Sequence, residues 1–114
     1  MANIIIADDV CDIRHFVCQS LRGYGHDVIC VSNGRMLYRI LGCNSEKFDL
    51  AIVDVSMPVL NGDEGVEMTK LFGIDCKILY ITGHDMDEKD GFPVLKKPFT
   101  IDELLKAVND ILKK

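Results

Sequence analysis

Residues 50–62 read LAIVDVSMPVLNG, and this stretch determines the fold class of the chain. It begins with the apolar run LAIV, which is short and partly β-branched, as is typical of a strand buried on both faces of a parallel sheet. The run ends at Asp54, and Pro58 then excludes further strand pairing because proline has no amide hydrogen to donate. A carboxylate at the end of a buried strand is costly to desolvate without a cation or hydrogen-bond donors nearby. Asp54 is therefore either a turn residue or a functional group.

Strands and helices alternate along the rest of the chain. Apolar, β-branched runs predict strands over residues 3–7, 26–31, 50–54, 76–82 and 92–95. Apolar residues at helical spacing predict helices over residues 10–21, 36–41, 66–72 and 101–112. Gly42 and Gly73 are expected to end the second and third helices, and Thr100 and Glu103 form a capping box before the last one. This alternation predicts a doubly wound α/β fold, with a parallel sheet covered by helices on both faces.

The composition narrows the class of protein. A chain of 114 residues suits one domain over residues 1–114. The formal net charge of −5 argues against direct binding to nucleic acid or to a membrane surface, and no apolar run approaches the roughly 20 residues of a membrane span. The N-terminus lacks a signal-peptide pattern, so we expect a cytoplasmic protein. The five cysteines have no zinc-site spacing and are interpreted as reduced thiols, mostly buried.

Charged and polar side chains follow the ends of four predicted strands. Asp8 and Asp9 follow the first strand, and Asp54 ends the third. Thr82 ends the fourth strand, and Lys97 follows the fifth. Because parallel strands all point the same way, these groups are expected to meet at one edge of the sheet. Three neighbouring carboxylates repel one another unless a cation neutralises them, and Mg²⁺ prefers oxygen ligands. A lysine and a hydroxyl opposite them match the charge and the hydrogen bonding of a phosphoryl group.

These residues occur in motifs that resemble those of the receiver domain of two-component response regulators. The motifs are Asp8-Asp9 after the first strand, Asp54-x-x-Met57-Pro58-x-x-x-Gly62, Thr82-Gly83 and Lys97-Pro98-Phe99. Each motif alone is weak, but together they follow the predicted elements over nearly the whole chain. The resemblance implies a flavodoxin-like sheet of five parallel strands in the order 2-1-3-4-5, similar to that of the stand-alone chemotaxis regulators.

The resemblance also implies a role for each of these residues. Asp54 would be the phosphoacceptor. Mg²⁺ would bind to Asp8, Asp9, Asp54 and the backbone carbonyl of Ser56, with Asp9 as a direct ligand and Asp8 acting largely through water. Thr82 would hydrogen-bond the phosphoryl oxygens and Lys97 would pair with them. The Lys97–Pro98 peptide bond would be cis, a form that only X-Pro bonds adopt at low energy.

The same resemblance implies the partners. The phosphoryl group would come from the phosphohistidine of a sensor histidine kinase or of a histidine phosphotransfer protein. The phosphorylated domain would then signal through contacts with a downstream protein. We expect a domain that phosphorylates and dephosphorylates itself rather than a dedicated enzyme.

Two features depart from the family pattern. Three residues before the motif lysine the family usually has an aromatic switch residue, and this chain has Val94. The nearest aromatic residue, Phe92, lies two positions earlier and therefore on the same face of the strand. Only fourteen residues separate Thr82 from Lys97, and residues 84–91 lack an apolar stripe. We therefore expect the fourth helix to be short, absent or mobile.

Some of the site residues also have other interpretations. Asp8 or Asp9 could cap the helix that begins near Val10, which would not exclude metal binding. In the family, the residues at the positions of Ser56 and His84 flank the attacking water, so this pair could set the lifetime of the phosphate.

Two alternative functions stay open beside the phosphoacceptor. One is a small Mg²⁺-dependent phosphohydrolase with Asp54 as its nucleophile. Many aspartyl phosphatases have a general acid two residues after the nucleophile, and Ser56 at that position argues against rapid turnover. The other is a phosphate-independent interaction module. The intact set of site residues argues against it, whereas Val94 and the altered fourth-helix region keep it open.

Overall fold

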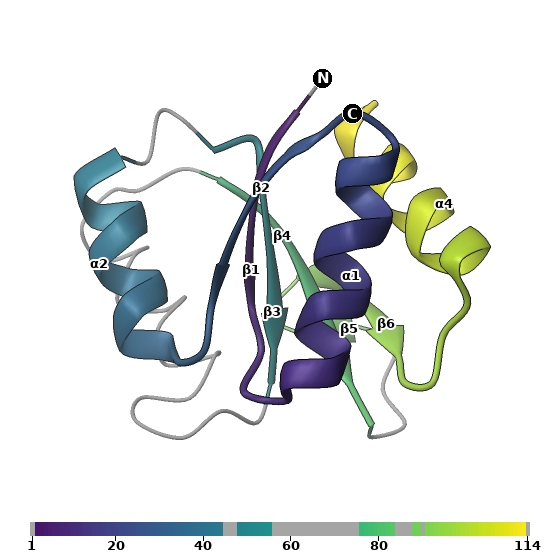
Figure 1. Ribbon diagram of the computed structural model, residues 1–114, viewed down its shortest axis with the longest axis horizontal. Coiled ribbons are helices and arrows are strands. Elements are labelled where there is room, and N and C mark those ends of the chain that lie inside the picture. Colours follow the sequence, from purple (N-terminus) through teal and green to yellow (C-terminus); the bar gives the residue numbers. More distant parts are fainter. Residues whose placement is uncertain (1, 45–47, 56–75, 84–87, 90, 114) are drawn as a thin grey trace.

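The structure is a computed structural model that describes residues 2–44, 48–55, 76–83, 88–89 and 91–113. Its strands and helices alternate along the chain (Figure 1). The strands are β1 (Asn3–Ala7), β2 (Asp27–Val31), β3 (Leu50–Asp54), β4 (Lys77–Thr82), β5 (Glu88–Lys89) and β6 (Phe92–Lys96). The helices are α1 (Cys11–Gly23), α2 (Gly34–Asn44) and α4 (Ile101–Leu112). The helix predicted over residues 66–72 and its expected end at Gly73 lie outside the described residues.

The strands form one sheet in the order β2-β1-β3-β4-β6-β5. All pairs from β2 to β6 are parallel, which confirms the predicted five-stranded sheet and its order 2-1-3-4-5. The short strand β5 was not predicted, and it pairs antiparallel with β6 through Glu88 opposite Pro93 and Lys89 opposite Phe92. Backbone pairing at the open edge of β6 thus rules out a helix through residues 88 and 89. The rest of the expected fourth-helix region, residues 84–87 and 90, lies outside the described residues.

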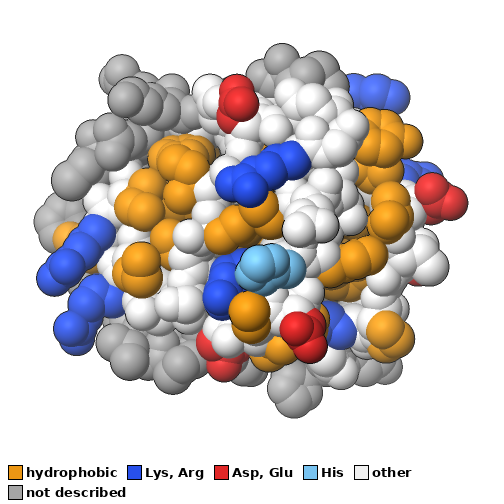
Figure 2. All heavy atoms as spheres, viewed as in Figure 1, with side chains coloured by type: hydrophobic (Ala, Val, Ile, Leu, Met, Phe, Trp, Pro, Cys, Tyr) orange, Lys and Arg blue, Asp and Glu red, His pale blue; other side chains and the backbone are white. Residues whose placement is uncertain are grey.

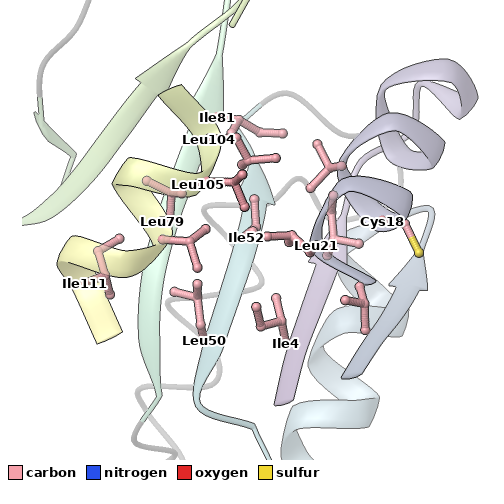
Figure 3. Close-up of a cluster of buried hydrophobic side chains, with 14 residues drawn as sticks. Ile4, Cys18, Leu21, Leu50, Ile52, Leu79, Ile81, Leu104, Leu105 and Ile111 are labelled. Atoms are coloured by element: carbon pink, nitrogen blue, oxygen red, sulfur yellow. The ribbon is translucent and has the colours of Figure 1, made fainter. Parts of the chain in front are cut away.

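Helices cover both faces of the sheet. Figure 1 shows α2 on one side and α1 with α4 on the other. All five residues of β3 are buried, so this strand has the position that its apolar run predicts. Alternate β3 residues contribute to two separate cores. Leu50 and Ile52 pack with side chains of α1 and α4 (Figure 3), and Ala51 and Val53 pack with side chains of α2.

Helix α2 is longer than predicted. It begins at Gly34 and continues through Gly42, which was expected to end it, to Asn44. The start is stabilised by Asn33, whose Oδ1 accepts a hydrogen bond of 2.9 Å from the Met36 amide. A glycine inside a helix costs about 1 kcal/mol relative to alanine but does not by itself end the helix. The prediction that Gly42 ends this helix is therefore wrong.

Helix α4 covers the same face of the sheet as α1. The predicted capping box is present, because Thr100 Oγ1 accepts from the Glu103 amide at 3.1 Å and Glu103 Oε1 accepts from the Thr100 amide at 3.0 Å. The buried face of the helix consists of Leu104, Leu105, Val108 and Ile111. A satisfied N-terminus and a continuous apolar face hold the chain in place directly after Lys97.

The cysteines differ from the expectation that they are mostly buried. Among the four whose side chains are described, Cys18 is buried, Cys30 and Cys76 are half-buried and Cys11 is exposed. Cys11 is the first residue of α1, so its side chain lies beyond the part of the helix that packs on the sheet. Within the described residues, the helices are too short and too polar to cross a lipid bilayer.

Candidate functional site

The predicted site residues lie together because the strand register aligns their strand ends. Ala7 of β1 lies opposite Val53 of β3, so Asp8 follows β1 beside the end of β3. Asp54 lies opposite Ile81 of β4, one residue before Thr82. Thr82 in turn lies opposite Lys96 of β6, one residue before Lys97. The four groups therefore meet at the carboxyl edge of the sheet, as the sequence predicts.

Asp8 is held by hydrogen bonds from three directions. Its Oδ1 accepts a hydrogen bond of 2.9 Å from the Val10 amide, and its own amide donates to the Val31 carbonyl of β2 at 3.2 Å. The main-chain carbonyl of Asp8 accepts from Arg14 Nη1 at 2.7 Å. The side chain is fully buried. Asp8 thus turns the chain into α1 through Val10, whereas the N-cap position of the helix, Val10, has no side-chain cap.

Lys97 is the cation opposite the carboxylates. Its Nζ lies 3.3 Å from Asp54 Oδ2, to which it donates a hydrogen bond, and 3.3 Å from Asp8 Oδ2. The contact with Asp8 has the distance of an ion pair but not the alignment of a hydrogen bond, so Asp8 Oδ2 has no hydrogen bond within the part of the chain that the structure describes. The Lys97 amide donates to the Thr82 carbonyl at 2.7 Å, which fixes the start of the Lys97 side chain. The Lys97–Pro98 peptide bond is cis, as predicted.

The three acids form a cluster of oxygen ligands. One carboxylate oxygen from each of Asp8, Asp9 and Asp54 lies within 4.8 Å of the other two. Asp8 and Asp54 are buried, whereas Asp9 is exposed, so an ion held here would face both protein oxygens and water. Mg²⁺ is usually bound by one or two carboxylates and keeps several waters. The donor set and the buried oxygen of Asp8 without a hydrogen bond fit this ion.

Thr82 also lies at this edge of the sheet and is almost fully buried, with 1% of its surface exposed. The structure therefore places a hydroxyl-bearing residue beside the carboxylates, as the sequence predicts. The remaining predicted ligand, Ser56, lies outside the described residues, as do His84 and the Met57, Pro58 and Gly62 positions of the central motif.

Phe92 is the aromatic residue that packs beside Val94, the position at which the family usually has its aromatic switch residue. Val94 of β6 lies opposite Tyr80 of β4. The rings of Tyr80 and Phe92 are 6.3 Å apart in an edge-to-face arrangement. Phe92 and Val94 both pack against the core on the α2 side, which confirms that they share one face of the strand.

One contributor to the site was not predicted from the sequence. Arg14, in the second turn of α1, holds the main chain of Asp8 through the 2.7 Å hydrogen bond to its carbonyl. A bond to a main-chain carbonyl leaves no pattern in the sequence that could have identified Arg14. Only the packing of α1 against β1 brings the two groups together.

A family model for the response regulator receiver domain matches residues 4–109. The chain belongs to this family. This receiver domain is 31% identical to the response regulator receiver protein CpdR of Brucella abortus, over 98% of each chain. It is 33% identical to the DNA-binding transcriptional regulator NtrC of Azospirillum brasilense, over 97% of this chain but 24% of that protein. It also spans about half, 52%, of a CpxR homolog of Haemophilus influenzae.

Solved structures show the same fold. The chemotaxis response regulator CheY4 of Vibrio cholerae superposes with a TM-score of 0.88 and 30% identity, covering 97% of this receiver domain and 98% of that chain. The receiver domain of the Francisella response regulator 1452 gives a TM-score of 0.88 with 26% identity, covering 99% and 98% of the two chains. Receiver domains are signalling domains of two-component systems, and the chain is a member of this family.

Proposed function

We propose that this receiver domain, over residues 1–114, accepts a phosphoryl group on Asp54. The observation that carries the proposal is the contact between Asp54 and Lys97, whose Oδ2 and Nζ atoms lie 3.3 Å apart. The Asp54 residue is only 5% exposed, so its charge is desolvated and its orientation is restricted. A carboxylate with this restricted orientation is prepared for attack on a phosphorus atom presented from the carboxyl edge of the sheet.

The proposed reaction is an in-line transfer from phosphohistidine. A carboxylate oxygen of Asp54 forms a bond to phosphorus, the bond between phosphorus and the imidazole nitrogen breaks, and the nitrogen takes up a proton. The Lys97 ammonium moves from the Asp54 carboxylate to the transferred oxygens, where it offsets their negative charge. The Thr82 hydroxyl donates a hydrogen bond to one of them. Because Lys97 also faces Asp8, its movement would leave the Asp8 and Asp9 carboxylates, beside the phosphoryl group on Asp54, in need of another cation.

We propose that this cation is Mg²⁺, held by Asp8, Asp9, Asp54 and the main-chain carbonyl of Ser56. When bound, Mg²⁺ supplies positive charge that offsets the charge of the phosphoryl oxygens. The exposed position of Asp9 leaves room for the waters that Mg²⁺ keeps. Asp8 contributes a buried oxygen that has no hydrogen bond among the described residues.

The proposed phosphodonors are a sensor histidine kinase or a histidine phosphotransfer protein. A mostly apolar pocket of about 440 Å³ lies directly beside Lys97, between α1 and the loop before α4. It is lined by Asp12, Ile13, Phe16, Lys97, Pro98 and Phe99. The Phe16 and Phe99 rings are 6.1 Å apart, and the Phe16 residue is 38% exposed. An apolar surface next to the acceptor supports docking of a donor protein.

The output of the proposed cycle is a change in contacts with a downstream protein, in the cytoplasm. The net charge of −5 supports a protein target over nucleic acid or an anionic membrane surface. The new phosphate on Asp54 would pull the Thr82 side chain toward it. Thr82 lies at the end of β4, two residues after Tyr80, whose ring contacts that of Phe92. A change in the packing of these two rings would carry the effect of phosphorylation from the site to the surface formed by β6.

The test uses phosphoramidate, whose P–N bond resembles that of phosphohistidine. The protein is incubated with phosphoramidate and Mg²⁺, and intact-mass spectrometry then measures the phosphate adduct. Wild type is expected to gain one phosphate and Asp54→Asn none. Asp27→Asn serves as the matched control, because Asp27 is exposed and begins β2 at the opposite end of the sheet. Absence of an adduct on the wild type would contradict the proposal.

Two further measurements under the same conditions distinguish the receiver function from the two alternatives. Release of many phosphates per chain, measured as inorganic phosphate over time, would favour a phosphohydrolase. Equal binding of a captured partner by wild type and Asp54→Asn, with and without phosphoramidate, would favour a phosphate-independent module. A stable adduct with phosphate-dependent partner binding is the result expected of the receiver function.

A further inference from the structure

Two cysteines from different elements share a small hollow on the α1 side of the sheet. Cys18 comes from the buried face of α1, and Cys30 comes from β2, the strand at the sheet edge. The hollow has a volume of about 290 Å³ and is lined by Arg14, His15, Cys18, Gln19, Arg22 and Cys30. Neither thiol takes part in the site at the strand ends, so this pair is a separate feature of the molecule.

The packing of α1 on β2 brings the two thiols together. Val28 and Cys30 point to the same face of β2 because strand residues alternate. Val28 and Cys18 belong to one buried cluster, against which Cys30 packs. Figure 3 shows the sulfur of Cys18 at the edge of this cluster, on the side away from α4. Cys18 is 5% exposed and Cys30 is half-buried, so the hollow opens to solvent beside Cys30.

Two arginines flank the thiols. Arg14, Cys18 and Arg22 are spaced four residues apart and form one row along α1. Arg22 Nη2 donates a hydrogen bond of 2.8 Å to the Val28 carbonyl, which holds its guanidinium against β2. Figure 2 shows basic side chains and a histidine side chain gathered over this part of the surface. Burial and the neighbouring Cys18 thiol raise the pKa of Cys30 to about 11, and the charges of Arg22 and Arg14 partly offset that rise.

We propose that Cys18 and Cys30 form a reversible intramolecular disulfide when the reduced protein meets a small organic disulfide. The Cys30 thiolate, the more accessible of the two, attacks one sulfur of the reagent, forms a mixed disulfide and releases a small thiolate. Cys18 then loses its proton to solvent, and its sulfur attacks the Cys30 sulfur and releases the second small thiolate. Two protein thiols lose two protons and two electrons, and the reagent is reduced to two thiols.

The bond would join the two elements that hold Asp8. Arg14, which lines the same hollow, donates from α1 to the Asp8 carbonyl at 2.7 Å. Val31, which follows Cys30 in β2, accepts from the Asp8 amide at 3.2 Å. A disulfide between Cys18 and Cys30 would therefore restrict the separation of α1 and β2, the two elements whose residues hydrogen-bond to the Asp8 main chain.

Peptide mapping provides a direct test, because each cysteine lies in its own tryptic peptide. Cleavage after Lys and Arg places Cys18 in residues 15–22 and Cys30 in residues 23–35. The dilute, reduced chain of residues 1–114 is treated with hydroxyethyl disulfide, quenched with N-ethylmaleimide, digested and analysed by mass spectrometry. The expected product is a crosslink of residues 15–22 to 23–35, which dithiothreitol reverses. Because thiolate is the attacking species, crosslinking is expected to be about tenfold faster at pH 8.5 than at pH 7.5.

Variants sharpen the test. Cys18→Ser is expected to stop at a mixed disulfide on Cys30, and Cys30→Ser is expected to give no crosslink. Cys11→Ser, which removes an exposed thiol outside the hollow, should crosslink as the wild type does. A persistent mixed disulfide on wild-type Cys30, or crosslinks that favour other cysteine pairs, would overturn the proposal. Because the wild-type map decides the outcome, the test holds even if a serine variant folds poorly.

Discussion

The Nζ atom of Lys97 lies 3.3 Å from Oδ2 of Asp8, an oxygen that is fully buried and has no hydrogen bond among the described residues. The Lys97 side chain is 19% exposed and that of Asp8 is fully buried. In its degree of burial, this ion pair is therefore intermediate between a surface pair and a fully buried one. Breaking a buried pair by removing one partner costs about 3–5 kcal/mol, because the other charge stays desolvated. Lys97 therefore stabilises the fold as well as the proposed chemistry.

This contact predicts that Lys97→Met lowers the free energy of unfolding by about 3 kcal/mol in the absence of Mg²⁺. The loss should shrink when Mg²⁺ is added, because the cation replaces the missing positive charge. Urea unfolding with and without Mg²⁺ measures both effects. Lys113→Met, an exposed residue just after α4, is the matched control and should change stability by less than about 0.5 kcal/mol. Equal losses for the two variants would contradict the prediction.

Mg²⁺ itself is expected to stabilise the folded protein. A ligand that binds only the folded state adds about 2.7 kcal/mol at a hundred times its Kd. Asp9→Asn should weaken Mg²⁺ binding at least tenfold, measured from the dependence of Tm on Mg²⁺ concentration. Asp12→Asn removes an equally exposed acid from the first turn of α1 and should leave the Mg²⁺ dependence unchanged. If both variants shifted the dependence alike, overall negative charge rather than a specific site would be responsible.

The capping box before α4 predicts a measurable local contribution. Thr100→Ala removes the hydroxyl that accepts from the Glu103 amide and should cost about 1 kcal/mol. Thr100→Ser keeps an oxygen in the same position and should cost much less. Urea midpoints of the two variants provide the comparison. An alanine variant as stable as the serine variant would show that the cap contributes little.

The core beneath α4 predicts a larger effect. Leu104→Ala creates a cavity among fully buried side chains and should lower the free energy of unfolding by about 2–5 kcal/mol. Ile101→Ala removes an apolar side chain from the same helix, but the residue is 44% exposed and the loss should be below about 1 kcal/mol. Chemical denaturation at one temperature compares the two. Similar losses would mean that α4 packs differently from the arrangement described above.

The raised pKa of Cys30 predicts a pH dependence of stability. The thiol has an ordinary pKa of 9.0 and a folded-state pKa of about 11, so the unfolded chain releases the proton first as pH rises. The stabilising contribution is complete below pH 9 and is lost between about pH 9 and pH 11. Cys30→Ser should therefore lose less stability over this interval than the wild type, as measured by urea unfolding. A Cys11→Ser control should follow the wild-type curve.

Much of the fold follows from local patterns. The LAIV run before Asp54 predicts a strand buried on both faces, and all of β3 is buried. The capping box at Thr100 predicts the start of α4, and the apolar spacing after it predicts the face that packs. These features depend on a few neighbouring residues, so they are readable without the tertiary structure. The end of α2 was mispredicted at Gly42 because a helical glycine is tolerated when the surrounding turns are stable.

The candidate site was predicted in its residue types and in its position. Asp8, Asp54, Thr82 and Lys97 meet because every parallel strand ends at the same edge, and this rule needs only the strand order. The support from Arg14 to the Asp8 carbonyl was not predictable, since a main-chain acceptor carries no sequence signal. The strand β5 was missed for a related reason, because two residues have no periodicity and form a strand only through pairing with β6.

The sequence by itself determined the class of fold, the strand that carries Asp54 and the set of polar groups at the strand ends. Their residue types and spacing are properties of short segments. The tertiary structure decided which side chains lie together: Lys97 between Asp8 and Asp54 at the strand ends, and Cys18 beside Cys30 on the α1 side of the sheet. The physical reason is that ion pairs and thiol contacts act over a few ångströms, between atoms whose separation depends on how helices and strands pack.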